Sequence, residues 1–120
     1  MFSLGSQTAL VTGGSQGIGC ALTVGLAEAG ANVVVFDINP PSTNFQSLSA
    51  TYGVATAYQQ LDVSNVPALK ESFRIINTFC EENDGLDICV ACAGVNQVVD
   101  FLETDESIFD RIMRINVKGA

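Results

Sequence analysis

Short apolar segments alternate with stretches of helical periodicity along most of the chain. Continuous apolar runs at Thr8–Thr12 and Asn32–Asp37 predict strands that are buried on both faces. Between them, residues 18–29 have the apolar content of a helix, and Gly30 follows where a helix commonly ends. This order of strand, helix and strand predicts a parallel sheet that is covered by helices.

The remainder of the chain continues the alternation with weaker patterns. Residues 54–61 and 86–92 are expected to form a third and a fourth strand, and residues 44–52 a short helix before the third. A longer helix is expected to begin near Pro67, and a last helix near Thr104, because these residue types suit the first turn and the N-cap of a helix.

A glycine cluster joins the first strand to the first helix. Gly13 permits a sharp turn, and Gly17 permits backbone N–H groups to approach a pyrophosphate. Gly19 permits close packing of the helix on the sheet, while the helix N-terminus offers unpaired donors and the positive end of its dipole. The predicted phosphate-binding residues are Gly13, Ser15, Gln16, Gly17, Ile18 and Gly19.

A carboxylate ends the second strand. Asp37 stands 18 residues after Gly19, the expected place for an acid that accepts hydrogen bonds from an adenosine ribose. Its charge repels a ribose 2′-phosphate, and Gln16 supplies no positive charge in the glycine turn. The sequence therefore predicts a dinucleotide site that prefers NAD over NADP. The alternative is a glycine-rich turn between a buried strand and helix, with Asp37 merely starting a loop.

The spacing of the glycines resembles that of the short-chain dehydrogenase/reductase family, in its alcohol and carbonyl oxidoreductase branch. Three residues separate Gly13 from Gly17, and Asp62 and Val63 end the third apolar segment, where that family holds the adenine ring. The resemblance covers essentially the whole chain. It implies an NAD(P)-binding site on a Rossmann-type fold.

The end of the fourth strand matches the family in part. Ala93 and Gly94 match the turn in which the family places its cofactor, and the resemblance implies that they contact it. Ala91 and Cys92 stand where the family usually has asparagines, whose amides bond across the central strands. Neither alanine nor cysteine can replace the donors and acceptor of an amide.

Asn116 is the candidate catalytic residue of this chain. It matches the family's asparagine on the helix after the fourth strand, which the resemblance implies supports a proton relay through an ordered water. Helical spacing places Asn116 on an apolar stripe with Phe109, Ile112 and Met113, so its amide needs partners if that face is buried. The alternatives are a structural amide that bonds a neighbouring carbonyl, or a frayed helix end in water.

The resulting fold class is α/β, a doubly wound Rossmann-type parallel sheet that is incomplete. Its strand order is expected to be 3-2-1-4, with right-handed crossovers. Residues 1–120 would form one NAD(P)-binding domain, the N-terminal part of a longer one. The fourth strand would be an open apolar edge, through which the isolated chain is expected to self-associate.

The resemblance implies hydride transfer between nicotinamide and a secondary alcohol or carbonyl, with a polyol or ketose as candidate substrate. In the family, a lysine stands four residues after the proton-transferring tyrosine. In this chain, the residues four positions after Tyr52 and Tyr58 are Thr56 and Asp62, so neither tyrosine has that lysine. We therefore expect the chain alone to be inactive and the catalytic serine, tyrosine and lysine to lie in a longer form, a homo-oligomer. The alternative is a non-catalytic nucleotide-binding or interaction protein.

Composition narrows the partners further. Thirteen acidic and five basic residues, a net charge of −8, disfavour nucleic acid and anionic membrane surfaces. No apolar stretch approaches the ~18 residues of a membrane span, and the N-terminus has no basic signal region, so a cytoplasmic location is expected. The chain has no histidine, and Cys89 and Cys92 would point to opposite faces of a strand, so no metal site is predicted.

Overall fold

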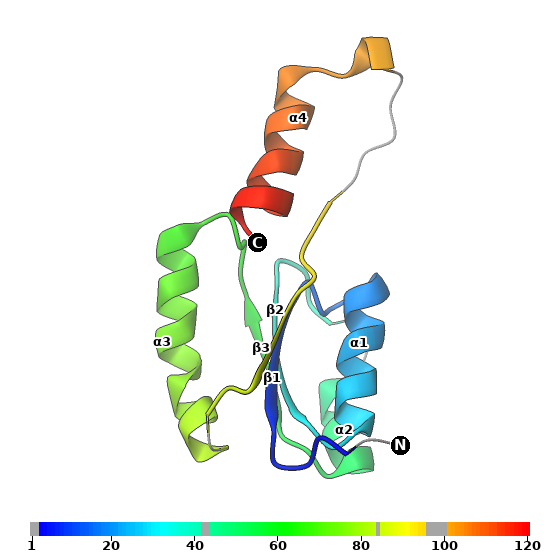
Figure 1. Cartoon of the computed structure of the whole chain (residues 1–120), viewed down its shortest axis with the longest axis vertical. Coiled ribbons are helices and arrows are strands. Elements are labelled where there is room, and N and C mark those ends of the chain that lie inside the picture. Colours follow the sequence, from blue (N-terminus) through cyan, green and yellow to red (C-terminus); the bar gives the residue numbers. More distant parts are fainter. Residues whose placement is uncertain (1–2, 42–43, 84, 96–100) are drawn as a thin grey trace.

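The chain folds into a four-stranded parallel sheet with helices on both faces (Figure 1). The computed structural model describes residues 3–41, 44–83, 85–95 and 101–120. Hydrogen-bonded neighbours run in the order β3-β2-β1-β4, which confirms the predicted strand order and the α/β class. Helices α1 and α2 cover one face of the sheet, and α3 covers the other (Figure 1).

The elements follow the predicted alternation, with somewhat shorter third and fourth strands. In chain order they are β1 (Thr8–Thr12), α1 (Gly17–Glu28), β2 (Asn32–Asp37), α2 (Phe45–Tyr52), β3 (Thr56–Gln60), α3 (Val66–Glu82), β4 (Ile88–Ala91), the 3₁₀-helix η1 (Phe101–Glu103), α4 (Glu106–Met113) and the π-helix η2 (Arg114–Lys118). The fourth strand ends before Cys92 because the N–H of that residue turns back to the carbonyl of Val90, at 3.1 Å.

Buried side chains gather on both faces of the sheet. The cluster beneath α3 consists of Leu10, Val34, Phe36, Leu61, Val63 and Ile76. The cluster beneath α1 and α2 consists of Val11, Ala27, Val33, Val35 and Val54. Successive residues of β2 alternate between the two clusters, and for this reason the strand is a continuous apolar run in the sequence.

Backbone segments meet so closely at the end of β1 that side chains are excluded. Gly13 has a φ of +71°, and a Cβ atom on it would lie 2.7 Å from the Cα of Ala93 in the turn after β4. A Cβ atom on Gly19 would collide with the carbonyl oxygen of Gly13. The first glycine therefore permits the turn, and the last permits helix α1 to lie against it.

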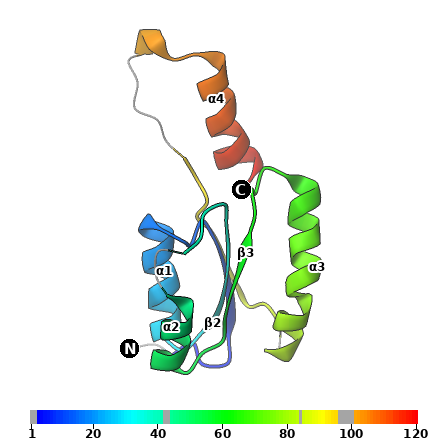
Figure 2. The ribbon, with the colours of Figure 1, turned by 180° about the vertical axis from the view of Figure 1, so that it is seen from behind.

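Helix α4 extends beyond the carboxyl edge of the sheet, as the two opposite views show (Figures 1 and 2). None of its residues is buried, and the Phe109 side chain is 57% exposed. The apolar stripe that Phe109 and Met113 form with Ile112 is therefore not a buried face in this chain. Only the following turn reaches the core, through Ile115, which packs against the cluster beneath α3. No helix in the described ranges is long and apolar enough to cross a membrane.

The close approach at Gly19 predicts that a side chain there destabilises the fold. Gly25, in the same helix, provides a control position. Gly19→Ala should lower the free energy of unfolding by about 1–3 kcal/mol, because the added methyl group overlaps backbone atoms. Gly25→Ala should raise it by up to about 1 kcal/mol, since nothing lies within 4 Å of a Cβ there. Urea denaturation of both variants is the measurement. Equal stability of the two variants would contradict the packing described here.

The edge of the sheet predicts self-association of the isolated chain. Among the described strands β4 pairs with β1 alone, and its Cys89 side chain is exposed on the face that α3 partly covers. An unpaired apolar edge can accept another strand, so sedimentation should show assembly that increases with protein concentration. Cys89→Lys should reduce that assembly, because a charge at a strand edge opposes pairing. A monodisperse monomer at high concentration would contradict the prediction.

Candidate functional site

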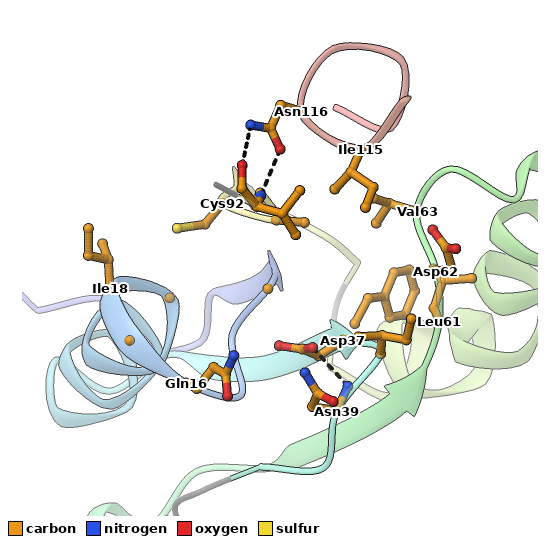
Figure 3. Close-up of a pocket in the computed structure, with 18 of the residues that line it drawn as sticks. Gln16, Ile18, Asp37, Asn39, Leu61, Asp62, Val63, Cys92, Ile115 and Asn116 are labelled. Atoms are coloured by element: carbon orange, nitrogen blue, oxygen red, sulfur yellow. Dashed lines mark hydrogen bonds between the residues drawn. The ribbon is translucent and has the colours of Figure 1, made fainter. Parts of the chain in front are cut away.

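A cleft of about 540 Å³ opens at the carboxyl edge of the sheet, where β1 and β4 end and α1 begins. Its volume lies within the usual range of small-ligand pockets, roughly 300–1,000 Å³. Figure 3 shows Gln16 and Ile18 on one side, Asp37 and Asn39 below, and Asn116 across the opening. Doubly wound sheets bind ligands at this edge, so the cleft is the candidate site.

Nearly all of the predicted site residues line this one cleft. They are Gly13, Gln16, Gly17, Ile18, Gly19, Asp37, Asp62, Val63, Ala93, Gly94 and Asn116. Ser15, the remaining predicted residue, is buried behind the turn, and its backbone N–H donates to the carboxylate of Asp37. The fold thus brings together residues that are separated by up to about a hundred positions in the chain.

The N-terminus of α1 faces the cleft without a side-chain cap. Helices α2, α3 and α4 have N-cap side chains that accept hydrogen bonds from their first turns, whereas the N-cap Gln16 of α1 makes none. Gly17 has a φ of +58°, and a Cβ atom on it would meet nothing within 4 Å. Backbone donors at this helix end are therefore available to an anionic ligand, which the helix dipole favours.

Asp37 connects the glycine turn to the end of β2. Its Oδ2 accepts the backbone N–H of Ser15 at 3.0 Å, and its Oδ1 accepts the backbone N–H of Asn39 at 2.9 Å. The residue is only 8% exposed. Each carboxylate oxygen can accept more than one hydrogen bond, so Asp37 retains acceptor capacity toward the cleft.

The end of β3 supplies a second carboxylate and an apolar wall. Asp62 accepts hydrogen bonds from the hydroxyl of Ser64 at 2.6 Å and from its backbone N–H at 2.9 Å. These bonds, with a smaller contribution from the charge of Arg114, lower the pKa of Asp62, so that it is ionised at neutral pH. Val63 beside it is buried in the cluster beneath α3.

The turn after β4 is held by side chains other than those of Ala91 and Cys92, which stand where the resemblance expects asparagines. The backbone N–H of Ala93 donates to the hydroxyl of Thr12 at 3.2 Å. The side chain of Asn116 makes two hydrogen bonds with the backbone of Val95. Its Oδ1 accepts the Val95 N–H at 2.8 Å, and its Nδ2 donates to the Val95 carbonyl at 2.8 Å. Figure 3 shows this pair of bonds, which joins Asn116 in η2 to the segment that follows β4. The Asn116 amide is therefore used structurally, and its part in a proton relay stays a prediction.

Several residues that line the cleft are not among the predicted site residues. They are Phe36, Ile38, Asn39, Leu61, Cys92, Val95, Arg111 and Ile115. Ile38 and Asn39 directly follow Asp37, so their position next to the predicted carboxylate was a signal that could have found them. Arg111 gave no such signal, because its approach depends on how α4 is oriented at the edge of the sheet.

Among the described residues, the cysteine and carboxylate side chains do not form a cluster that could hold a metal ion. In residues 3–41, 44–83, 85–95 and 101–120, no three His, Cys, Asp or Glu side chains lie close enough together to hold a metal ion. None of the four cysteines, all of which lie in the described ranges, forms a disulfide, including Cys89 on β4 and Cys92 after it.

Two sequence relatives show what this chain is similar to. A short-chain dehydrogenase/reductase of Armillaria gallica is 34% identical over 117 residues, which cover 95% of this chain and 44% of that protein. The L-rhamnose 1-dehydrogenase (NADP(+)) of Thermoplasma acidophilum is 30% identical over 121 residues, which cover 99% and 46%. The chain thus spans less than half the length of these relatives.

Similarity to solved structures and to a family model agrees with these relatives. A short chain dehydrogenase from Leptospira borgpetersenii with bound NAD+ has a TM-score of 0.82 and 26% sequence identity, covering 98% of this chain and 42% of that one. Residues 7–120 match the model of the family described as short chain dehydrogenase. The chain therefore belongs to the short-chain dehydrogenase/reductase family.

Proposed function

We propose that this chain is the dinucleotide-binding part of an oxidoreductase that transfers a hydride between a nicotinamide cofactor and a secondary alcohol or carbonyl. The observation that carries the proposal is the hydrogen bond of 3.0 Å between the Ser15 N–H and Asp37, which joins the glycine turn and the strand-end carboxylate at one cleft. Residues 1–120 would constitute one domain, or the N-terminal part of one, in a longer protein.

The residues present fit a dinucleotide. The open backbone at Gly17 and the uncapped end of α1 suit its pyrophosphate, and Asp37 suits a ribose hydroxyl. The adenine ring would lie near Asp62 and Val63 at the end of β3, while Ala93 and Gly94 would contact the cofactor after β4. The family resemblance assigns the same roles to these residues.

NAD is proposed in preference to NADP. Asp37 is a buried carboxylate in the cleft wall, where a 2′-phosphate would bring a second negative charge close to it. Among the described lining residues Arg111 is the only cation, and it comes from α4 rather than from the glycine turn. Relatives include an NADP(+) enzyme and a protein with bound NAD+, so the preference rests on this chain's own residues.

The bound nicotinamide would supply or accept the hydride, and this chain's residues would hold and orient it. No tyrosine or lysine is among the described residues that line the cleft. The serine, tyrosine and lysine that move the substrate proton in the family are proposed to belong to the rest of a longer, homo-oligomeric and cytoplasmic protein. A sugar, polyol or ketose is the proposed substrate class, and the relative from Thermoplasma acidophilum is an L-rhamnose dehydrogenase.

A non-catalytic nucleotide-binding protein is the second candidate. It is favoured by one observation, that both polar groups of the Asn116 amide are engaged by the backbone of Val95. Such a protein would bind the dinucleotide at the same cleft and would have no catalytic tyrosine and lysine in its longer form. The sequence that follows residue 120 in the gene distinguishes the two candidates.

The proposed role of Asp37 predicts how tightly the chain binds each of the two reduced cofactors. The unaltered chain should bind NADH more tightly than NADPH, and Asp37→Ala should narrow the difference by about tenfold, since a charge-assisted hydrogen bond and a repulsion are both removed. Asp37→Ala should also weaken NADH binding, because the Ser15 and Asn39 N–H groups lose their acceptor. Fluorescence titration with both reduced cofactors is the measurement.

A matched control for that experiment is Asp110→Ala, which removes an exposed carboxylate of α4 that does not line the cleft. This variant should bind both cofactors as the unaltered chain does. Tighter binding of NADPH than of NADH by the unaltered chain would refute the assignment of NAD.

Catalysis makes the second prediction. Residues 1–120 should show no measurable dehydrogenase activity, since general acid–base catalysis alone commonly contributes about 10²–10⁴-fold. A longer form with a Tyr-x-x-x-Lys segment should oxidise or reduce a member of a polyol and ketose panel. Both lengths would be followed at the nicotinamide absorbance. Robust turnover by the 120-residue chain would show that its own residues complete an active site.

A further inference from the structure

Tyr58 on β3 reaches the turn that follows β2 without lining the cleft itself. Its hydroxyl lies 3.1 Å from the carbonyl oxygen of Asp37 and 2.8 Å from that of Asn39. Its ring packs against the cluster beneath α1 and α2. A tyrosine hydroxyl has one proton, which these two carbonyls share or accept in turn.

Among the described residues, the start of this turn has another close contact with the end of β3, since the N–H of Leu61 donates to the carbonyl oxygen of Asp37 at 2.9 Å. Pro40 and Pro41 follow Asn39, and proline has no backbone N–H with which the chain could be tied down. The amide of Gln60 reaches the carbonyl of Ile38 only at 3.4 Å. At the carbonyl of Asn39, the Tyr58 hydroxyl is the close donor among the residues that the structure describes, and it links the end of the turn to β3.

The same turn carries the carboxylate that the proposed function assigns to the ribose. The Asn39 N–H donates to Oδ1 of Asp37, so the position of Asn39 affects the orientation of that carboxylate. Asp37 and Asn39 both line the cleft. Burial, and secondarily the charge of Asp37, raise the pKa of the Tyr58 hydroxyl, which therefore stays protonated and able to donate at neutral pH.

We propose that Tyr58 is a positioning residue, which holds the turn from Asp37 to Asn39 where the carboxylate faces an adenosine ribose. The inference rests on the proposed function for the identity of the ligand, but the anchoring of the turn by Tyr58 is independent of it. Loss of the anchor should affect NADH, which needs the carboxylate, more than NADPH, which the carboxylate repels.

Tyr58→Phe in the full 120-residue chain tests the inference, because it removes the hydroxyl and keeps the ring. Its dissociation constant for NADH should rise about threefold to tenfold, the range expected for one neutral hydrogen bond, and that for NADPH should change less. Amide hydrogen exchange of Asn39, measured without ligand, should be faster, while exchange in β1 and β2 stays unchanged. Tyr52→Phe is the matched control, since the Tyr52 ring at the end of α2 does not line the cleft.

Several outcomes would overturn the inference. They are an unchanged dissociation constant for NADH, an equal loss for NADH and NADPH, an equal effect of Tyr52→Phe, and faster exchange throughout the sheet, which would indicate general destabilisation. If the unaltered chain bound neither cofactor, the proposed function would fail. Exchange at Asn39 would then decide by itself whether Tyr58 holds the turn.

Discussion

The close approach of three backbone segments at the carboxyl end of β1 is the constraint on which the rest of the structure depends. Gly13 contacts the turn after β4, and Gly19 brings the first turn of α1 against Gly13. Gly14, between them, is also tight, because a Cβ there would lie 2.8 Å from the hydroxyl of Thr23 and 2.9 Å from Val35. Removing side chains here permits both the cleft and the packing of the sheet beneath it.

Hydrogen bonds to the carboxylate of Asp37 connect the glycine turn to the neighbouring strand ends. Asp37 lies at the end of β2 and fastens the glycine turn on one side and its own turn on the other. Its carbonyl oxygen accepts the N–H of Leu61 at 2.9 Å, which adds the end of β3 to the same set of contacts. The glycine turn, the turn after β2 and the end of β3 are thus connected through Asp37, which would itself bind a ligand.

Features that follow from local sequence pattern could be predicted from the sequence. Features that depend on strand register or on the orientation of a helix could not. The glycine turn and Asp37 were predictable because strand ends of a parallel sheet meet at one edge. Tyr58 was not, since its contacts with the second strand depend on the register that pairs it with Val35. The exposure of α4 was not predictable either, because an amphipathic pattern indicates which face can be buried but not whether a partner covers it.

The double use of the Asp37 carboxylate has an evolutionary consequence. Under the proposed assignment of Asp37 to the ribose, a lineage that moved toward a phosphorylated cofactor by losing this acid would also lose the support of the glycine turn and of the neighbouring turn. The first step would therefore tend to reduce fitness unless substitutions that restore those supports had already occurred nearby. Positions 15, 37 and 39 should accordingly be epistatic, and changes of cofactor in descendants of this sequence should arise through ordered combinations rather than through single replacements.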